Sequence, residues 1–269
     1  RVGVAWDIFG NGKTSLRGGY GISYERNFGN VTFNVIQNPP NYAVITLSPS
    51  DVGGNLPVTI SNFGPLAGST GTAKLPIVQL RAVDPNMQTA YAHFWSVSLE
   101  QGIAKDTVLS VQYTGSRGVG LYSINRENNL GSANVFLGVT GPLSRENPQY
   151  SNINFRTDNG FSRYHGMITE LRSQNLFNSG VQLKFNWTWA HSLDNISDTF
   201  SGFSNDFNLG LLDPRNPSLD YGNSDFDVRH RIALSGVWDV PFAKNMKGVG
   251  SQILGGWSFA PIFTAHTGL

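Results

Sequence analysis

The chain contains no cysteine, few charged residues and no long apolar run, and each shortage excludes a class of structure. Its 269 residues can form no disulfide and no thiolate metal site. It has no run of about 18 apolar residues, the length that a transmembrane helix needs. Charged residues make up 14% of the chain, below the roughly 25% of an average soluble domain. The formal net charge of +1 gives no electrostatic reason to expect a nucleic-acid partner.

Sequence motifs of common enzymes are missing as well. There is no Gly-x-Ser-x-Gly motif of the hydrolase kind and no His-Glu-x-x-His motif of zinc proteases. Residues 10–14, GNGKT, end like a phosphate-binding loop, but Asp7 stands where that motif has its first glycine, and a strand pattern follows. Asn-Gly between two alternating stretches instead predicts a hairpin turn. We therefore expect no enzyme activity and no cofactor or metal.

The strongest positive signal is the alternation over residues 181–192, VQLKFNWTWAHS. Its odd positions are apolar or aromatic as far as Trp189, with His191 last, and its even positions are polar or small. Because successive strand side chains point to opposite faces, this pattern predicts one long strand with an apolar and a polar face. A strand between lipid and a wet lumen alternates in this way, and so does a half-buried strand of a soluble sandwich. The alternation alone leaves both open.

Similar patterns predict an all-β fold, an antiparallel meander of about eight long strands in four hairpins. The expected strands are residues 2–8, 14–24, 89–100, 107–117, 163–174, 181–192, 226–240 and 252–267. Pro261 lies inside the last of them. Because proline has no N–H for the ladder, we expect a bulge at that point.

The connections between these strands are of two kinds. Every hairpin turn is short, whereas the segments between hairpins, at about 25–88, 118–162 and 193–225, contain 64, 45 and 33 residues. A connection of 64 residues is unusual in a compact soluble domain. Short turns at one end of the strands and long loops at the other are typical of outer-membrane barrels. The loop lengths therefore favour a membrane barrel over a soluble sandwich.

Charge is divided between the two strand faces in the same sense. The predicted apolar faces carry no charged side chain except Arg163, at a strand end. A charge at the membrane mid-plane costs about 2–4 kcal/mol on a lipid-facing surface, so lipid enforces such a division. The candidates for a polar path for solute are Arg17, Glu100, Lys184, Arg229 and Arg231. The alternative role for these groups is cross-strand ion pairing and packing against a plug.

Amphipathic aromatic rings are expected where the membrane meets water. The candidates for membrane-interface aromatics are Tyr113, Trp187, Trp189, Trp238 and Trp257. With outer-membrane lipid as the partner of the apolar face, these rings lie at headgroup level.

Residues 1–26, RVGVAWDIFGNGKTSLRGGYGISYER, resemble the barrel of TonB-dependent outer-membrane receptors, in particular the Oar-like group. Similar strings follow in the same order at residues 112–118, 163–166, 186–194, 226–231, and 256–257 with 264–268. The resemblance implies a Gram-negative outer-membrane barrel of about 22 strands, filled by a separate plug domain. It also implies partnership with the TonB complex and uptake of a bulky solute. Eight strands are too few for such a lumen, so we expect a fragment of a barrel, without its plug domain.

Two functional hypotheses remain at this point. In the first, the chain is part of an energy-coupled receptor whose external loops contact the solute and whose polar wall lines the passage. In the second, the same strands form a sandwich in an extracellular binding or structural protein, soluble or surface-attached. The two differ in where the apolar faces lie, against lipid or against a second sheet.

Overall fold

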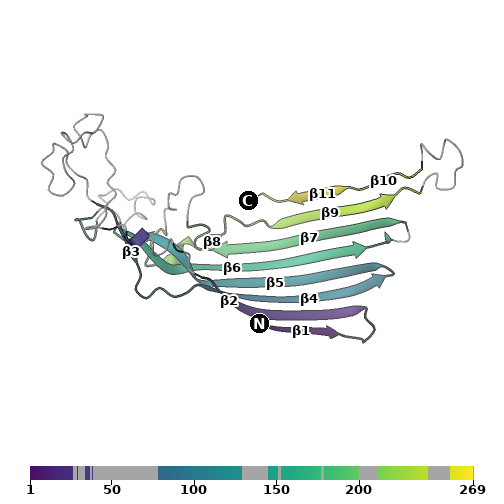
Figure 1. The fold of residues 1–269 in the computed structure, drawn as a ribbon, viewed down its shortest axis with the longest axis horizontal. Helices are drawn as coiled ribbons and strands as arrows, with labels where there is room; N and C mark the ends of the chain where they lie inside the picture. Colours follow the sequence, from purple (N-terminus) through teal and green to yellow (C-terminus); the bar gives the residue numbers. More distant parts are fainter. Residues whose placement is uncertain are drawn as a thin grey trace, which may run out of the picture.

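The computed structural model describes residues 1–26, 29, 34–36, 38, 78–128, 145–150, 153–176, 179–199, 211–241 and 255–268. Eleven strands in this part of the chain belong to a single sheet, shown in Figure 1. Short 3-10 helices, η1 (Asn34–Ile36) and η3 (Pro217–Asp220), lie between strands. Among the described residues no helix is long and apolar enough to cross a membrane.

The sheet is an antiparallel meander. In spatial order it contains β1 (Val2–Asp7), β2 (Thr14–Tyr24), β4 (Tyr91–Ala104), β5 (Thr107–Arg126), β6 (Ile153–Ser173), β7 (Val181–Asp194), β9 (His230–Asp239) and β10 (Ser258–Phe259). A further strand, β11 (Ile262–His266), follows β10 and also pairs with β9. Two short strands lie off this path: β3 (Leu80–Val83), parallel to β6, and β8 (Gly222–Asn223), antiparallel to β7. The predicted all-β meander of about eight long strands is confirmed.

Pro261 separates β10 from β11 and so divides the last predicted strand in two. Phe259 lies opposite Trp238 and Ile262 lies opposite Ser235, three residues further along on both strands. The predicted irregularity is therefore an interruption, without the extra residue of a bulge. The ladder continues through the proline carbonyl, which accepts a hydrogen bond from Gly236 N at 3.2 Å.

Turn chemistry explains the first two hairpins. In the turn after β1, Gly10 and Gly12 have φ of 63° and 70°, values that favour glycine. The Asp7 carboxylate closes this turn by accepting a hydrogen bond from Gly12 N at 2.7 Å. The hairpin between β4 and β5 turns at Lys105–Asp106, where Asp106 has φ of 58°. All four hairpin turns join strands at one end of the sheet, called the turn end (Figure 1).

The three long connections leave β2, β5 and β7 at the opposite end of the sheet, called the loop end. Their expected bounds need correction. β5 runs to Arg126 and β6 begins at Ile153, so both strands continue well into the predicted loop 118–162. The loop 25–88 contains η1 and β3, and the loop 193–225 contains η3 and β8. Residues 39–77, 129–144 and 200–210 of these loops lie outside the described residues.

A break in the alternation hides the continuation of β5 and β6. The pairing register of the two strands shifts between Gly118 and Leu121 and again before Ser123. Gly120 has φ of 61°, which belongs to a bulged and not a regular strand. In the sequence, this glycine-rich stretch looks like a loop, because apolar and polar residues no longer alternate there. In the structure, the backbones of β5 and β6 remain hydrogen-bonded to each other beyond it.

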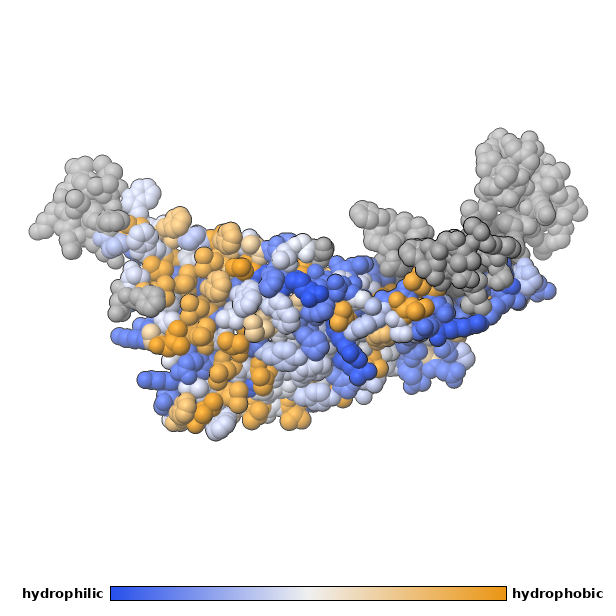
Figure 2. Space-filling model, turned by 180° about the vertical axis from the view of Figure 1, so that it is seen from behind, coloured by the Kyte–Doolittle hydropathy of each residue, from blue (hydrophilic) through white to orange (hydrophobic). Residues whose placement is uncertain are grey.

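Most of the apolar side chains lie on one face of the sheet, and no second sheet packs against them among the described residues. Val2 is 75% exposed and Val4 64%. Figure 2 shows apolar residues gathered over the turn-end part of this face and hydrophilic residues toward the loop end. The side chains with the lowest exposure are instead polar and lie at the loop end: Ser123, Asn125, Asn128, Asn154 and Arg156. The described sheet therefore lacks the apolar core between two sheets that the sandwich hypothesis requires.

Candidate functional site

The face of the sheet opposite the exposed apolar side chains is called the inner wall. The register places Arg17 in line with Ser98, Gln112, Ile168, Thr188 and Arg231 across six strands. Side chains an even number of residues apart on a strand point to the same face. Glu100 is two residues from Ser98, Lys184 is four from Thr188, and Arg229 is two from Arg231. These three side chains therefore also lie on the inner wall. All five predicted candidates for the polar path thus lie on one wall, together with the apolar Ile168.

Two groups of charged side chains on the inner wall form ion pairs, and each group includes one pair between neighbouring strands. Arg17 Nη2 lies 3.5 Å from Glu100 Oε2, between β2 and β4. Glu170 Oε1 lies 2.7 Å from Arg172 Nε, and its other oxygen lies 3.5 Å from Lys184 Nζ on β7. The period-two pattern places Glu170 and Arg172 inside, but it does not show that Glu170 pairs with Lys184. That pairing depends on the register between β6 and β7.

A hollow of about 750 Å³ lies on the inner wall at its turn end. Arg172, Lys184, Gln182 and Ser235 supply polar groups, and Pro261 and Ile262 supply apolar ones. Arg172 and Lys184, the two ion-pair partners of Glu170, are among its lining residues. Asp106 also lines it, so charges of both signs, amide groups and apolar carbon meet there. Such a lining suits a polypeptide segment or a large amphipathic solute better than a small ion.

Asp227 fastens the loop end of β9 to β7 and is itself almost fully buried. Its Oδ1 accepts a hydrogen bond from Ser192 N at 2.7 Å, and its Oδ2 accepts one from Arg229 Nε at 2.5 Å. Burial alone raises the pKa of the Asp227 carboxyl, but these two donors outweigh burial and hold the pKa below its ordinary value. Arg229 also donates to Asn223 Oδ1 at 3.2 Å. Arg229 is therefore a fixed structural cation, whereas Arg231 forms no ion pair with any described residue.

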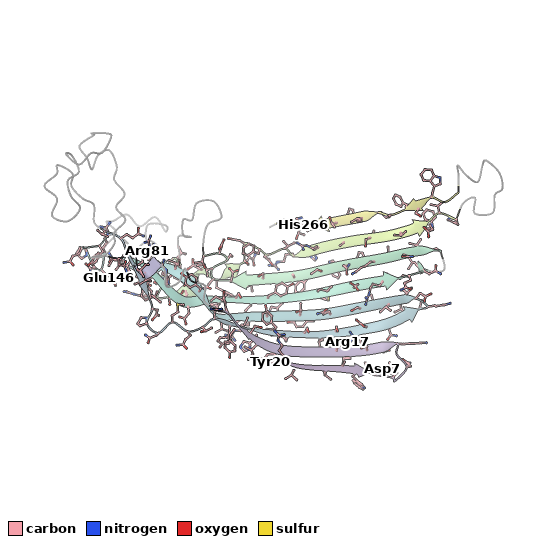
Figure 3. All side chains as sticks on the ribbon, in the orientation of Figure 1. Asp7, Arg17, Tyr20, Arg81, Glu146 and His266 are labelled. Carbon is pink, nitrogen blue, oxygen red and sulfur yellow. The ribbon has the colours of Figure 1, made fainter. Side chains whose placement is uncertain are left out.

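A second cluster of charged side chains lies at the loop end of the sheet. Figure 3 shows Arg81 and Glu146 there, well away from Arg17. Glu146 forms an ion pair with Arg215, across two different connections. Burial raises the pKa of the nearby Glu127 carboxyl, and the charge of Arg215 opposes that rise. Arg156 is fully buried here, and its Nη1 donates to Asn154 O at 3.2 Å. The sequence did not predict a role for any of these residues, because the long connections contain no recognisable motif or alternation.

The outer wall, which is the exposed apolar face, carries rings paired with histidines. Tyr20 Oη lies 2.6 Å from His93 Nδ1, and Tyr113 Oη lies 2.7 Å from His165 Nδ1. Trp187 stacks on His230 with an interplanar angle of 5°, and its Nε1 donates to His230 Nδ1 at 3.3 Å. Each pair satisfies polar ring atoms on an otherwise apolar surface. In the described ranges no three His, Asp or Glu side chains gather as metal ligands.

A family model described as the outer membrane beta barrel domain matches residues 1–269. The chain belongs to this family. Its apolar outer wall therefore faces the lipid of the outer membrane, and its polar inner wall faces the interior of the barrel. No protein of curated function matches the sequence.

Among solved structures, the chain is similar to the outer membrane transporter YddB from Escherichia coli. The TM-score is 0.52 with 12% sequence identity, and the match covers 87% of this chain. It covers 26% of the transporter, so the chain spans about a quarter of that protein's length. At this identity the likeness concerns the fold: a barrel wall of the same kind.

The five predicted interface aromatics all lie on or beside the outer wall of the outer-membrane barrel. Tyr113 on β5 and Trp189 on β7 lie in one line across the sheet, joined by Met167 on β6, and Trp187 lies two residues from Trp189 on the same face. Trp238 lies opposite Val181 and Phe259 near the turn end, where Trp257 is 64% exposed. Their depth in the membrane stays a prediction.

The sequence-based division of charge was wrong in one respect. Arg117 also points to the outer wall, because it lies opposite His93 on one side and opposite Arg163 on the other. Within the described strands the outer wall thus carries two arginines, on neighbouring strands, where the sequence indicated one.

Proposed function

We propose that this chain forms part of the barrel of a TonB-dependent receptor, which takes up a bulky solute across the outer membrane with energy from the TonB complex. The observation that carries the proposal is the open sheet. Among the described strands, β1 and β11 are each paired on one side only. Hydrocarbon does not tolerate unpaired backbone groups, so further strands have to complete the wall. A wall longer than eight strands encloses a lumen wide enough for a large solute.

The inner wall supports the same proposal. Arg17, Glu100, Glu170, Arg172 and Lys184 of this wall form ion pairs, two of them between neighbouring strands, so the positive and negative charges largely balance and the wall stays polar without a strong field of one sign. The hollow beside Lys184 offers a site against which a plug domain packs. The pairs of the inner wall then hold the plug at rest, and the loop end, with its charged groups, receives the solute. We assign the chain no catalytic role.

The test uses the protein as its gene encodes it, in its own bacterium. Deleting the gene is expected to stop depletion of one class of solute from the medium, measured by mass spectrometry of the spent medium. Dissipating the proton gradient with a protonophore is expected to stop the same depletion in the wild type. Depletion that needs the gene but survives the protonophore indicates a passive channel and contradicts energy coupling. Recovery of the protein in the soluble fraction contradicts a receptor altogether.

A further inference from the structure

The two arginines of the outer wall stand in an unusual place. Arg117 on β5 and Arg163 on β6 are directly opposite each other in the antiparallel ladder, and both are exposed. Like charges at directly opposed positions repel and destabilise the pair. In the described part of the chain neither guanidinium forms an ion pair or a side-chain hydrogen bond. The face that lipid covers therefore carries two uncompensated positive charges side by side.

Their depth follows from the strand geometry. The two strands begin at the turn end with the pair Thr107 and Ser173, and the two arginines lie ten residues along from it. Ten residues span about 33 Å of strand. At a tilt of about 40° this is about 25 Å along the barrel axis, which equals the height of the apolar band of such barrels. The arginines thus lie where the hydrocarbon ends and the lipid headgroups begin.

The leaflet follows from the direction of the strands. Barrels of this kind have their short turns on the periplasmic side and their long loops outside the cell. The arginines lie toward the loop end, so they face the outer leaflet. The residues below them belong to the ring-bearing part of the outer wall: Trp95, Gly115 and His165 are the next outward-facing positions. Rings just below a basic pair are the arrangement that a membrane interface favours.

The structure also provides space beside the arginines. A hollow of about 340 Å³ is lined by both of them together with Val119, Phe161 and the glycines of the bulge. Gly118, Gly120 and Gly160 contribute no side chains, so the backbone itself forms part of the lining. The hollow combines two cations with apolar carbon, which matches an amphiphile and not a free ion.

One acidic group lines the same hollow. Asp158 lies on its rim, and its Oδ2 accepts a hydrogen bond from Gln88 N at 2.8 Å. No ion pair within the described residues joins Asp158 to Arg117 or Arg163. The carboxylate is therefore engaged with the backbone of another segment, and it leaves both arginines available.

We propose that Arg117 and Arg163 form a binding site for the phosphate of an outer-leaflet lipid. The phosphate lies between the two guanidinium groups. Each guanidinium donates bidentate hydrogen bonds to the phosphate oxygens, the geometry that arginine favours with phosphate. The acyl chains run down the outer wall over the apolar residues below. The bound phosphate removes the repulsion between the two arginines, so lipid binding also stabilises the junction of β5 and β6.

The test measures binding of phosphatidic acid to the protein as its gene encodes it, purified in a neutral detergent, by native mass spectrometry. The double variant Arg117→Gln and Arg163→Gln is expected to bind about twenty- to thirtyfold more weakly, since each basic group near an anionic surface contributes roughly a fivefold factor. The matched control is Lys105→Gln with Arg145→Gln, which removes two exposed positive charges away from the outer wall. Control binding is expected to equal that of the wild type.

Equal loss of binding in the two double variants overturns the proposal. If the arginine variant does not assemble, the wild type decides the question: equal affinity for phosphatidic acid and for diacylglycerol, which lacks the phosphate, overturns the site. Inorganic phosphate distinguishes a lipid from a free anion. Failure of inorganic phosphate to displace the lipid at equal concentration is expected, and displacement by it contradicts a lipid site. These results do not depend on energy coupling or on the solute.

Discussion

Trp95 lies across Gly115, its partner on the neighbouring strand of the outer wall. A side chain on Gly115 would place its Cβ 2.5 Å from Trp95 Cζ2. The indole continues beyond the glycine to His165, with ring centroids 6.3 Å apart at an angle of 61°. Because Gly115 has no side chain, the Trp95 indole from β4 lies over β5 and reaches His165 on β6 on the lipid-facing surface.

Replacing Gly115 by alanine is expected to impair barrel assembly, because Trp95 has to leave its place. Overpacking of this kind costs about 1–3 kcal/mol. Heat-modifiable gel migration of the full-length protein measures the folded fraction. Gly3→Ala is the matched control, since a Cβ there meets its nearest neighbour, Gly18 O, at 3.6 Å. Equal folding of the two variants would mean that the indole has an alternative position.

Leu234 and Ser235 test the assignment of the two walls. Leu234 lies opposite Phe185 and Phe263 on the outer wall, whereas Ser235 lies opposite Lys184 on the inner wall. Leu234→Arg is expected to reduce membrane insertion, with a cost of about 2–4 kcal/mol for a charge near the middle of the lipid. Ser235→Arg is expected to insert better. Insertion is measured by protection from protease in outer-membrane vesicles, and the reverse order would mean that the walls are exchanged.

Asp227 gives the protein a predictable pH dependence. The folded state lowers the pKa of this carboxyl, so its contribution to stability is present above the unfolded pKa, about 3.9. The contribution is lost as the pH falls through the lower, folded pKa. Asp227→Asn is expected to lower the free energy of unfolding at neutral pH by about 1–3 kcal/mol, because a buried charged acceptor is removed.

The difference between Asp227→Asn and the wild type is expected to shrink in acid, because protonation removes the same charge. Urea titrations of the protein in lipid vesicles, across the acidic range, measure it. Asp225→Asn is the control, since Asp225 is exposed and its carboxylate forms no hydrogen bond with a described residue. A constant difference at every pH would contradict the assigned role of the charge.

Glu170 tests the ion pairs of the inner wall. Glu170→Gln leaves Arg172 and Lys184 without their shared partner, and we expect a loss of about 1 kcal/mol, because the pairs are partly exposed to water. Lys184→Gln in the same background is expected to cost less than it does alone. A double-mutant cycle on unfolding midpoints measures the coupling. Additive effects would show that the 3.5 Å contact between Glu170 and Lys184 contributes nothing to stability.

The amino-acid sequence by itself determined which wall most side chains occupy. Along 181–192 the alternation assigns Phe185 and Trp187 outward and Lys184 inward, and the structure agrees. This assignment is local, because a strand places neighbouring side chains on opposite faces whatever its partner. Turn residues are local in the same way, so the hairpin at Gly12 was also predictable. At Pro261 the sequence predicted the place of the irregularity but not its form, which is an interruption instead of a bulge.

Only the tertiary structure decided which residues meet across strands. The opposition of Arg117 and Arg163, the sharing of Glu170 between Arg172 and Lys184, and the fastening of Asp227 to Ser192 depend on the register of separate strands. Register is set by all the contacts of a strand pair together, and a slip of one residue exchanges the faces. The extension of β5 and β6 beyond the predicted strand ends likewise comes from pairing around a glycine-rich bulge, which no period within either strand reveals.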